Sequence, residues 1–278
     1  MTLFAGSLED ASRLVVYDGA SGNELWRIPF DHGYGLAFSS DGALIASPHP
    51  TKRMVQLFDA LRIVPLDSME CPPADYECEG GVHVASLPHE RGFLTATFSE
   101  HGGSIFEWNA THGLMRSLPP TDDTILRIAT SPTGDWFTMD LADLATGERT
   151  VLVREYPSAE KKCSWSGVSS APIGQQNMAA VATGEEIIIY NVETCQPAYS
   201  LNGKQPDVAA DPAGRVLAAM TTDFQLTLYD LQTQQPGPTG KVSSSSSSHR
   251  LVRMAFNRDG SLLAIAQDSD LHILRILP

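Results

Sequence analysis

Short apolar runs separated by polar turns follow one another along the whole chain. Runs of four to six residues rich in Val, Ile and Leu, such as RLVVYD from Arg13 and EIIIYN from Glu186, alternate with stretches containing Gly, Asp and Pro. Runs this short, bounded by turn residues, are typical of β-strands rather than helices. The pattern therefore predicts an all-β protein.

The turns recur with a regular period. The glycines that close one type of polar turn, as in FSSDG and NRDG, are Gly42, Gly92, Gly134, Gly174, Gly214 and Gly260. They are separated by 50, 42, 40, 40 and 46 residues, within the range of about 40 to 50 residues that is typical of propeller repeats. Each period has room for four short strands.

A second marker has nearly the same spacing. An aromatic residue followed by Asp or Asn ends a strand at Tyr17-Asp18, Phe58-Asp59, Trp108-Asn109, Tyr190-Asn191 and Tyr229-Asp230. Gly supplies the positive φ that a tight hairpin requires, and Asp or Asn hydrogen-bonds its own backbone at a turn. We therefore expect the glycines between the first and second strands of each unit, and the Asx residues between the third and fourth.

The segments AFSSDGALIAS, AFNRDGSLLAIA and YDGASGNEL resemble the repeats of divergent WD40/YVTN-like β-propellers, and the resemblance covers nearly all of the chain. It implies four-stranded antiparallel sheets arranged in a ring. We expect a seven-bladed β-propeller that forms a single domain over residues 1–278. The residues expected to be buried between blades are Leu36, Phe38, Val84, Ile128, Val216, Met254, Leu263 and Ile265.

The expected ring has six complete blades and an incomplete N-terminal blade. The opening runs TLFAGS, RLVVYD and ELWRI match the second, third and fourth strands of a unit, so a first strand is missing. Residues before Met1 or a partner chain are expected to complete this blade. In the fourth period we expect a lengthened loop from Leu141 to Arg149 and the third strand from Thr150 to Tyr156.

Composition narrows the classes of partner. The chain has 33 Asp and Glu against 19 Lys and Arg, a net charge of -14, which repels nucleic-acid phosphates and anionic lipid surfaces. We therefore expect no nucleic-acid or membrane partner. The start MTLFAGSLED lacks the basic and apolar segments of an export signal, so the expected protein is soluble and cytoplasmic.

The four cysteines leave the compartment open. Cys71 and Cys78 lie in one loop with two prolines between them and are a possible disulfide, which would indicate an extracytoplasmic protein. The alternative is a pair of reduced thiols. Cys163 and Cys195 are assigned to opposite ends of a blade and are expected to be free. Neither CxxC spacing nor a nearby His pair is present, so no metal or other cofactor is expected.

The leading functional hypothesis is a non-enzymatic scaffold that binds a protein partner. The insertions 66–81, 156–167 and 236–250 all fall on connections that emerge at one rim of a propeller, and loops on a rigid scaffold commonly carry binding. Acidic residues around a tyrosine gather there, which favours a partner segment rich in Lys or Arg. The partner-binding candidates are Asp67, Glu70, Asp75, Tyr76, Glu77, Glu79, Asp122 and Asp123.

The alternative hypothesis is an enzyme or a small-ligand or metal-binding protein that works at the mouth of the central channel. Converging first strands could bring together Asp31, His32, Asp207 and His249 there. No motif with catalytic spacing supports this hypothesis, and a loop histidine that hydrogen-bonds its own blade is the simpler interpretation. We expect no catalytic residue.

Overall fold

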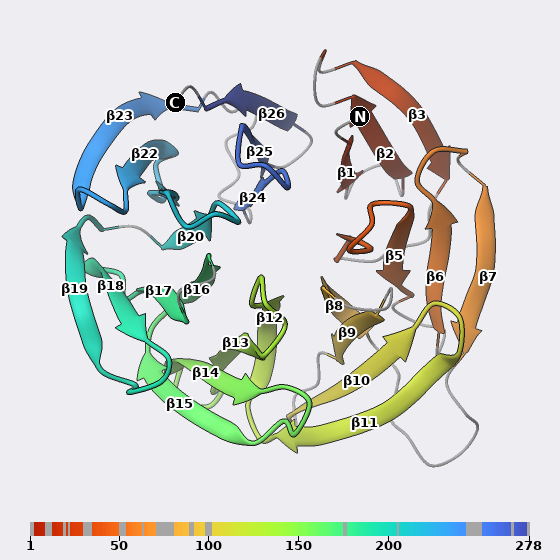
Figure 1. Cartoon of the computed structure of the whole chain (residues 1–278), viewed down its shortest axis with the longest axis horizontal. Helices are drawn as coiled ribbons and strands as arrows, with labels where there is room; N and C mark the ends of the chain where they lie inside the picture. The colour runs from red at the N-terminus through yellow and green to blue at the C-terminus, as the bar shows by residue number, and fades with distance from the viewer. Residues whose placement is uncertain are drawn as a thin grey trace.

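The computed structural model describes residues 3–8, 13–18, 21, 23–29, 35–49, 54–62, 64–70, 81–88, 92–97, 102–174, 177–204, 206–242, 252–267 and 270–276. These residues form 26 strands and no helix. The strands make seven antiparallel sheets that are arranged in a ring, with the first and last sheets side by side where the two termini lie (Figure 1). The expected all-β propeller of four-stranded antiparallel sheets is confirmed.

Each sheet is a meander of strands that are consecutive in the chain. The first sheet contains β1 (Leu3–Leu8), β2 (Arg13–Asp18) and β3 (Glu24–Pro29). The second contains β4 (Ala37–Phe38), β5 (Leu44–Pro48), β6 (Met54–Asp59) and β7 (Pro65–Glu70). The third contains β8 (Gly81–Ser86), β9 (Gly92–Thr97), β10 (Gly103–Asn109) and β11 (Gly113–Thr121).

The fourth sheet contains β12 (Thr124–Thr130), β13 (Trp136–Ala142), β14 (Arg149–Glu155) and β15 (Lys161–Ser166). The fifth contains β16 (Ser169–Ile173), β17 (Met178–Ala182), β18 (Glu186–Asn191) and β19 (Pro197–Asn202). The sixth contains β20 (Asp207–Ala210), β21 (Val216–Met220), β22 (Gln225–Asp230) and β23 (Gln235–Lys241). The seventh contains β24 (Val252–Phe256), β25 (Leu262–Gln267) and β26 (Asp270–Arg275).

Five sheets therefore have four strands among the described residues, and the first and the seventh have three. We expected six complete sheets. The difference lies at the C-terminal end, where β26 is the last described strand and no fourth strand pairs with it within the described residues. Completion of the first sheet by residues before Met1 or by a partner chain stays a prediction.

Seven hydrophobic clusters join the sheets of the described structure, one at each boundary around the ring. The cluster between the third and fourth sheets buries Ile105, Phe137 and Met139 completely. The cluster between the seventh and first sheets is small: Tyr17 of β2 packs against Leu262 and Ala264 of β25. Burial of apolar surface stabilises each boundary by about 25 cal/mol per Å², and among the described residues the boundary that closes the ring has the fewest buried members.

Most turns form as the sequence predicts, but Gly92 is the first residue of β9 rather than a turn glycine. Gly42, Gly134, Gly214 and Gly260 have φ between 70° and 79° in the hairpins between the first two strands of their sheets. Asx side chains cap the turns between the last two strands of a full sheet. In the fifth sheet, for example, Asn191 Oδ1 accepts hydrogen bonds from the backbone N–H groups of Glu193 and Thr194 at 2.9 and 3.0 Å. The recurring sequence pattern is therefore a recurring local hydrogen-bond pattern.

The fourth sheet partly corrects the sequence prediction. Its third strand is confirmed as β14, but the loop before it runs only from Asp143 to Glu148 because β13 and β14 extend to residues 142 and 149. Asp143 shortens the loop: its Oδ1 accepts the N–H of Ala145 at 2.8 Å and its Oδ2 accepts the hydroxyl of Thr146 at 2.7 Å. An Asx turn therefore stands here between the second and third strands.

The predicted core residues divide into two groups. Ile128, Met254, Leu263 and Ile265 are buried. The other four are half-buried, and Leu36, Phe38 and Val84 of these pack against clusters between sheets. In the third sheet, Trp108 Nε1 donates a buried hydrogen bond to Thr95 Oγ1 at 2.7 Å, which ties the third strand to the second.

Candidate functional site

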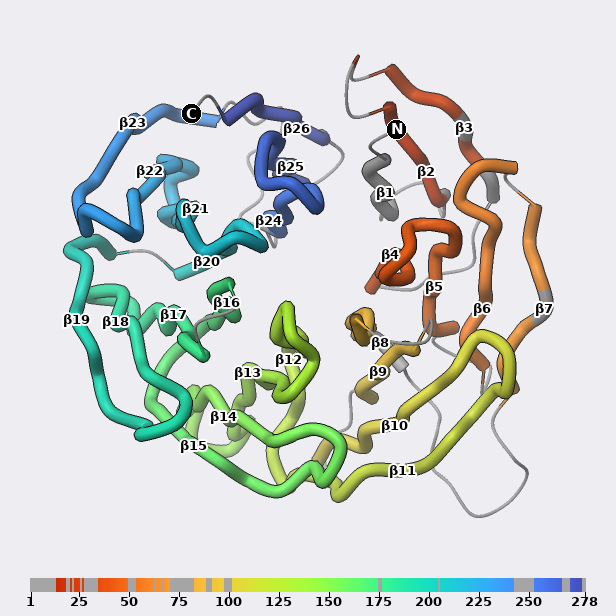
Figure 2. The backbone as a smooth tube through the Cα atoms, in the orientation of Figure 1, coloured from red at the N-terminus to blue at the C-terminus, as the bar shows by residue number. Residues whose placement is uncertain are grey.

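Strands β8, β12, β16, β20 and β24 are the first strands of their sheets and lie near the centre of the ring (Figure 2), and they carry all but one of a group of charged and polar residues. We call it the central cluster, and its members are His83 on β8, Arg127 on β12, Asp140 on β13, Ser169 and Ser170 on β16, Asp207 on β20 and Arg253 on β24. Strand alternation explains their position: Arg127 precedes the buried Ile128, and Arg253 precedes the buried Met254, so each arginine points away from the core.

An ion pair spans the cluster. Arg127 Nη1 donates to Asp207 Oδ1 at 3.1 Å and also lies 3.3 Å from Ser169 Oγ. Ser169 Oγ in turn donates to Asp207 Oδ1 at 3.1 Å. The two charged side chains are 20% and 13% exposed, so this pair is only partly screened by water. It connects the fourth sheet to the sixth across the inner strand of the fifth.

Asp140 lies behind this ion pair and is fully buried. Ser170 donates to it from both its hydroxyl, at 2.5 Å to Oδ1, and its backbone N–H, at 3.2 Å to Oδ2. Burial nevertheless raises the pKa of Asp140 to about 6, because desolvation of the carboxylate outweighs the charge of Arg127 and the two hydrogen bonds. The pair forms a polar link between the fourth and fifth sheets.

The surroundings of the two remaining members, His83 and Arg253, explain why their pKa values are lowered. Burial, and then the positive charges of Arg253 and Arg127, lower the pKa of His83 to about 4, so this imidazole is neutral at pH 7. Burial and then repulsion by Arg127 lower the pKa of Arg253, whereas Asp207 and Asp140 act in the opposite direction. Many protein atoms lie near the Arg253 side chain, but part of its surface remains exposed to solvent.

The described members of the cluster differ in how far solvent reaches them. Ser170 and Asp140 have 1% and 3% of their surface exposed, so a substrate cannot reach this hydrogen-bonded pair. In the part of the chain that the structure describes, no group of three His, Cys, Asp or Glu side chains could hold a metal ion. Among the described members of the cluster, Arg253 is exposed and Arg127 and Asp207 are partly accessible.

Asp207 is the one channel-mouth candidate that the structure describes, and it lies in the central cluster. Asp31, His32 and His249 lie outside the described residues. The sequence prediction did not include Arg127 or Arg253. A charged residue in the middle of an apolar first strand, as in ILRIA and LVRMAF, is the signal that could have found them.

Of the predicted partner-binding residues, Glu70 and Asp122 are exposed and Asp123 is half-buried. Glu70 ends β7 and Asp122 follows β11, so both stand where the chain passes from the outer strand of one sheet to the inner strand of the next. Asp67 lies in β7, and only its backbone is described. Asp75, Tyr76, Glu77, Glu79 and the possible disulfide partners Cys71 and Cys78 lie outside the described residues.

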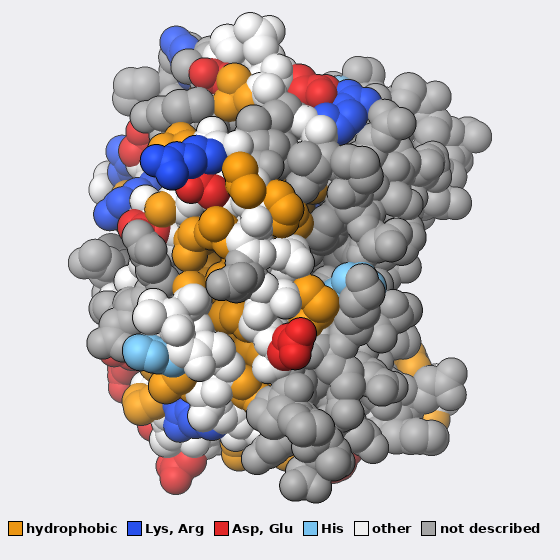
Figure 3. Space-filling model, turned by 90° about the vertical axis from the view of Figure 1, so that its right-hand side faces the viewer, with side chains coloured by type: hydrophobic (Ala, Val, Ile, Leu, Met, Phe, Trp, Pro, Cys, Tyr) orange, Lys and Arg blue, Asp and Glu red, His pale blue; other side chains and the backbone are white. Residues whose placement is uncertain are grey.

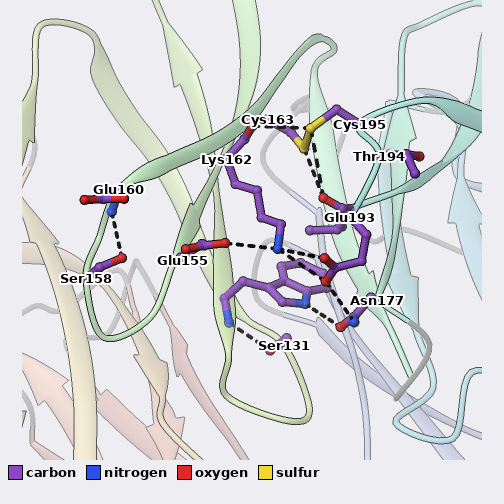
Figure 4. A network of polar contacts seen from close by, with 12 residues as sticks. Ser131, Glu155, Ser158, Glu160, Lys162, Cys163, Asn177, Glu193, Thr194 and Cys195 are labelled. Carbon is purple, nitrogen blue, oxygen red and sulfur yellow. Dashed lines mark hydrogen bonds and ion pairs between the residues drawn. A yellow bond between two sulfur atoms is a disulfide. The ribbon is translucent and has the colours of Figure 1, made fainter.

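The expectation that Cys163 and Cys195 are free is wrong. They form a disulfide with Cα atoms 5.5 Å apart (Figure 4). Cys163 lies on β15, the outer strand of the fourth sheet, and Cys195 lies in the turn between β18 and β19 of the fifth. The sequence reasoning placed the two residues at opposite ends of one blade, whereas they face each other across the boundary between two.

Ion pairs reinforce the same boundary. Lys162 Nζ lies 3.1 Å from Glu155 Oε1 and 3.3 Å from Glu193 Oε1, and Asn177 Nδ2 donates to Glu193 Oε1 at 3.0 Å (Figure 4). Trp136 Nε1 donates to Asn177 Oδ1 at 3.2 Å. The disulfide and this network fix the fourth and fifth sheets to each other on the rim opposite Glu70 and Asp122.

The outer face of the first three sheets has a different character. Figure 3 looks onto this side and shows hydrophobic side chains gathered on the described surface. Large exposed hydrophobic residues of these sheets are Leu25, Leu61, Val64, Leu66 and Met115. The outer strands β15, β19 and β23 expose Lys, Ser, Thr, Asn and Gln side chains, together with Ala and Pro on β19 and Pro on β23. Among the described residues no helix is long and apolar enough to cross a membrane.

Comparison with known proteins supports the fold. No family model matches the chain, and no curated protein matches it. A chain from a crystal structure of a mitotic checkpoint complex is 15% identical, with a TM-score of 0.75, over 99% of this chain and 87% of the other. A chain of hydrazine synthase from Kuenenia stuttgartiensis is 13% identical, with a TM-score of 0.74, over 95% and 90%. The chain therefore has a divergent WD40-like β-propeller fold.

Proposed function

We propose that the protein is a rigid platform that binds a protein partner through the rim carrying the connections between sheets. The observation that carries this proposal is the position of Glu70 and Asp122. Both carboxylates are exposed on the same rim of neighbouring sheets, and neither forms an ion pair among the described residues. Unpaired surface charge steers an oppositely charged partner and selects for it.

The fold supports this use. Propellers similar to this one serve as subunits of assemblies, and the checkpoint-complex chain named above is one of them. The seven clusters between sheets hold the rims in fixed positions, and loops on a rigid scaffold are common binding sites. We therefore propose a non-enzymatic scaffold whose partner presents a segment rich in Lys or Arg.

The test compares two variants that remove equal charge from opposite rims. The first carries Glu70→Ser and Asp122→Ser, and the control carries Asp135→Ser and Glu160→Ser, which are exposed on the other rim. In a pull-down from native lysate, we expect the first variant to lose partners that wild type retains at low salt and releases at high salt. The control variant should retain them.

A further variant extends the test to the segment between β7 and β8, with Asp75, Glu77 and Glu79 replaced by Ser. If both rim variants recover the same proteins as wild type, with the same salt sensitivity, the rim is not a recognition surface. That result would favour the alternative, in which the acidic residues of this rim are solvated and only add to the surface charge.

A small-ligand function at the centre of the ring is the second candidate, because Asp207 lies in the central cluster there. A thermal-shift screen with divalent metals and common metabolites separates the two functions. A rise in Tm of several degrees with one compound would favour this candidate, since a ligand that binds only the folded state stabilises it by mass action.

We also propose that the chain forms one domain in which the two three-stranded sheets are separate blades, for a total of seven. The packing of Tyr17 on Leu262 and Ala264 supports this, because it links the first sheet to the last. One domain should unfold in a single cooperative transition in a calorimeter. Two resolved transitions would contradict the proposal.

The disulfide favours an oxidising compartment, in contrast to the cytoplasmic location expected from the N-terminal segment. Disulfides persist outside the cytosol and are rare within it. We propose that the protein acts in such a compartment. Alkylation of intact cells followed by mass spectrometry should detect linked Cys163 and Cys195 peptides, and alkylation of both thiols would contradict the proposal.

A further inference from the structure

The turn between β6 and β7 of the second sheet is apolar where the equivalent turns of other sheets are polar. It reads DALRIVP, whereas the turns before the outer strands of the fifth and sixth sheets read NVETCQP and DLQTQQP. All three turns have the same length, because each follows an aromatic residue that pairs with the proline at the end of the turn: Phe58 with Pro65, Tyr190 with Pro197 and Tyr229 with Pro236. The three turns can therefore be compared position by position.

The backbone of these turns is held in the same way. Asp59 Oδ1 accepts hydrogen bonds from the N–H groups of Leu61 and Arg62 at 2.9 and 2.7 Å. In the sixth sheet, Asp230 Oδ1 accepts the two equivalent N–H groups at 2.8 and 2.9 Å. The same turn thus forms with glutamine and threonine side chains, so the fold does not require the apolar ones of the second sheet.

The apolar side chains of this turn face solvent. Leu61 is 64% exposed, Val64 is 52% exposed and Leu66, at the start of β7, is 40% exposed. The equivalent residues of the sixth sheet are Gln232, Gln235 and Gly237. Isolated exposed apolar residues are ordinary, whereas a group of them marks an interaction site. We call Leu61, Arg62, Val64 and Leu66 the apolar turn.

The neighbouring sheets repeat the apolar residue at the position of Leu66. Counted from the residue that pairs with the next-to-last residue of the preceding strand, this position holds Leu25 on β3 and Met115 on β11. These side chains are 40% and 52% exposed. The fourth, fifth and sixth sheets have Lys162, Ala198 and Gly237 there. Strands β3, β7 and β11 follow one another along the outside of the ring (Figure 1), and Figure 3 shows hydrophobic side chains gathered on this side.

Arg62 adds a positive charge to the apolar turn. Its side chain is exposed and forms no ion pair among the described residues. Two backbone hydrogen bonds, from Arg62 and Leu61, lower the pKa of Asp59, and the charge of Arg62 contributes less to this shift. An exposed guanidinium bordered by apolar side chains is complementary to a carboxylate with apolar surroundings, and arginine is enriched in the residues that dominate binding at protein interfaces.

We propose that the apolar turn inserts into an apolar groove of a partner protein that carries Asp or Glu at its border. Leu61 and Val64 fill the groove, and Arg62 pairs with the carboxylate. An anionic lipid surface is a poorer match, since it repels a chain with a net charge of -14. The apolar turn precedes β7 and Glu70 ends it, so this surface is separate from the rim proposed above and takes a partner of the opposite charge.

Site-specific crosslinking tests the position of the contact. A photoreactive amino acid replaces Val64 in one protein and its equivalent Gln235 in a matched control, and both are irradiated in native lysate. We expect the Val64 position to crosslink to a partner about tenfold or more above the control. Sequencing of the crosslinked peptide should find a segment that has apolar residues together with Asp or Glu.

Substitutions test the chemistry of the contact. Leu61→Gln, made in the protein with the photoreactive residue at position 64, gives the turn a side chain of the sixth sheet, so Tm should change by no more than about 2 °C. The crosslink should fall about tenfold or more. Arg62→Glu should lower it similarly, and replacement of the partner's crosslinked Asp or Glu by Lys should restore it. If Leu61→Gln unfolds the protein, the Arg62→Glu pair of measurements supplies the test.

Four results would overturn the proposal. The first is an equal crosslink yield at the Val64 and Gln235 positions, and the second is a crosslinked segment without apolar residues or carboxylates. The third is sedimentation of wild type, but not of Leu61→Gln, with vesicles of phosphatidylcholine and phosphatidylserine, which would indicate a membrane contact. The fourth is a wild-type dimer that Leu61→Gln dissociates in analytical ultracentrifugation. The variant with Glu70→Ser and Asp122→Ser should keep the crosslink, so the rim proposal can fail without affecting this one.

Discussion

Ser170 donates two hydrogen bonds to the buried carboxylate of Asp140, one from its hydroxyl at 2.5 Å and one from its backbone N–H at 3.2 Å. The contact crosses from the inner strand of the fifth sheet to the second strand of the fourth. The pKa of Asp140 is nevertheless raised, to about 6, by burial. The link between the two sheets therefore depends on pH.

We predict that Asp140 makes the folded protein less stable as the pH rises from about 4 to about 6. In this window the folded state holds a proton that the unfolded chain, with an Asp pKa of about 3.9, has lost. The free energy of unfolding falls by roughly 2 to 3 kcal/mol across the window and is level above it. Asp140→Asn lacks this dependence, so the stability of wild type relative to the variant should fall with pH in urea unfolding.

The control for this prediction is Asp143→Asn. Hydrogen bonds from Thr146 and Ala145 lower the pKa of the exposed Asp143, so its contribution to stability is present above about pH 4 and is lost as the pH falls through the lowered folded pKa. The two variants should therefore differ from wild type with opposite pH trends. Parallel curves for wild type and Asp140→Asn would contradict the raised pKa.

Tyr156→Phe should destabilise the boundary between the third and fourth sheets. Tyr156 Oη donates to Glu107 Oε1 at 2.8 Å, and Arg116 Nε lies 2.6 Å from Glu107 Oε2. Removing a hydrogen bond to a charged group costs about 1.5 to 3 kcal/mol. Tyr199→Phe is the matched control, because its Oη lies 3.5 Å from Leu231 O and should contribute less. Equal losses in urea unfolding would show that the Glu107 contact contributes little.

Thr95→Val tests the buried hydrogen bond from Trp108. The substitution keeps the side-chain shape but leaves the indole N–H without its acceptor at 2.7 Å, which should cost about 1 to 3 kcal/mol. Thr138 is also buried, but its hydroxyl lies 3.5 Å from Ala129 O, so Thr138→Val should cause a smaller loss of stability. Chemical unfolding followed by tryptophan fluorescence measures both. The prediction fails if the Thr138 variant is the less stable one.

Loss of the disulfide should lower the free energy of unfolding by about 3 to 4 kcal/mol, because it closes a loop with a sequence separation of 32 residues. The measurement is unfolding of wild type with and without a reductant, beside a variant with Cys163→Ser and Cys195→Ser. That variant should match reduced wild type. Any remaining sensitivity of the variant to reductant would report a second disulfide between Cys71 and Cys78. No effect of reduction on wild type would contradict the prediction.

The sequence alone determined the features that depend on a few neighbouring residues. Strand runs, hairpin glycines such as Gly42 and Asx turns such as that of Asn191 are local, and their regular spacing predicts a propeller. The repeat also predicts which rim carries the connections between sheets, where Glu70 and Asp122 are exposed. The expected insertion 156–167 on that rim is wrong, because residues 156–160 form the turn between β14 and β15 on the opposite rim and the rest is largely β15. The predicted loop in the fourth sheet was too long, because the short turn capped by Asp143 resembles one from another part of the repeat.

Only the tertiary structure decided which distant residues meet. Arg127 and Asp207 are 80 residues apart in the chain, and Cys163 and Cys195 lie in different sheets. Strand patterns give the spacing within one sheet but not the rotation from one sheet to the next, so they cannot indicate that inner strands bring these side chains together. The raised pKa of Asp140 arises from burial between two sheets, and burial is a property of the packed ring rather than of any segment.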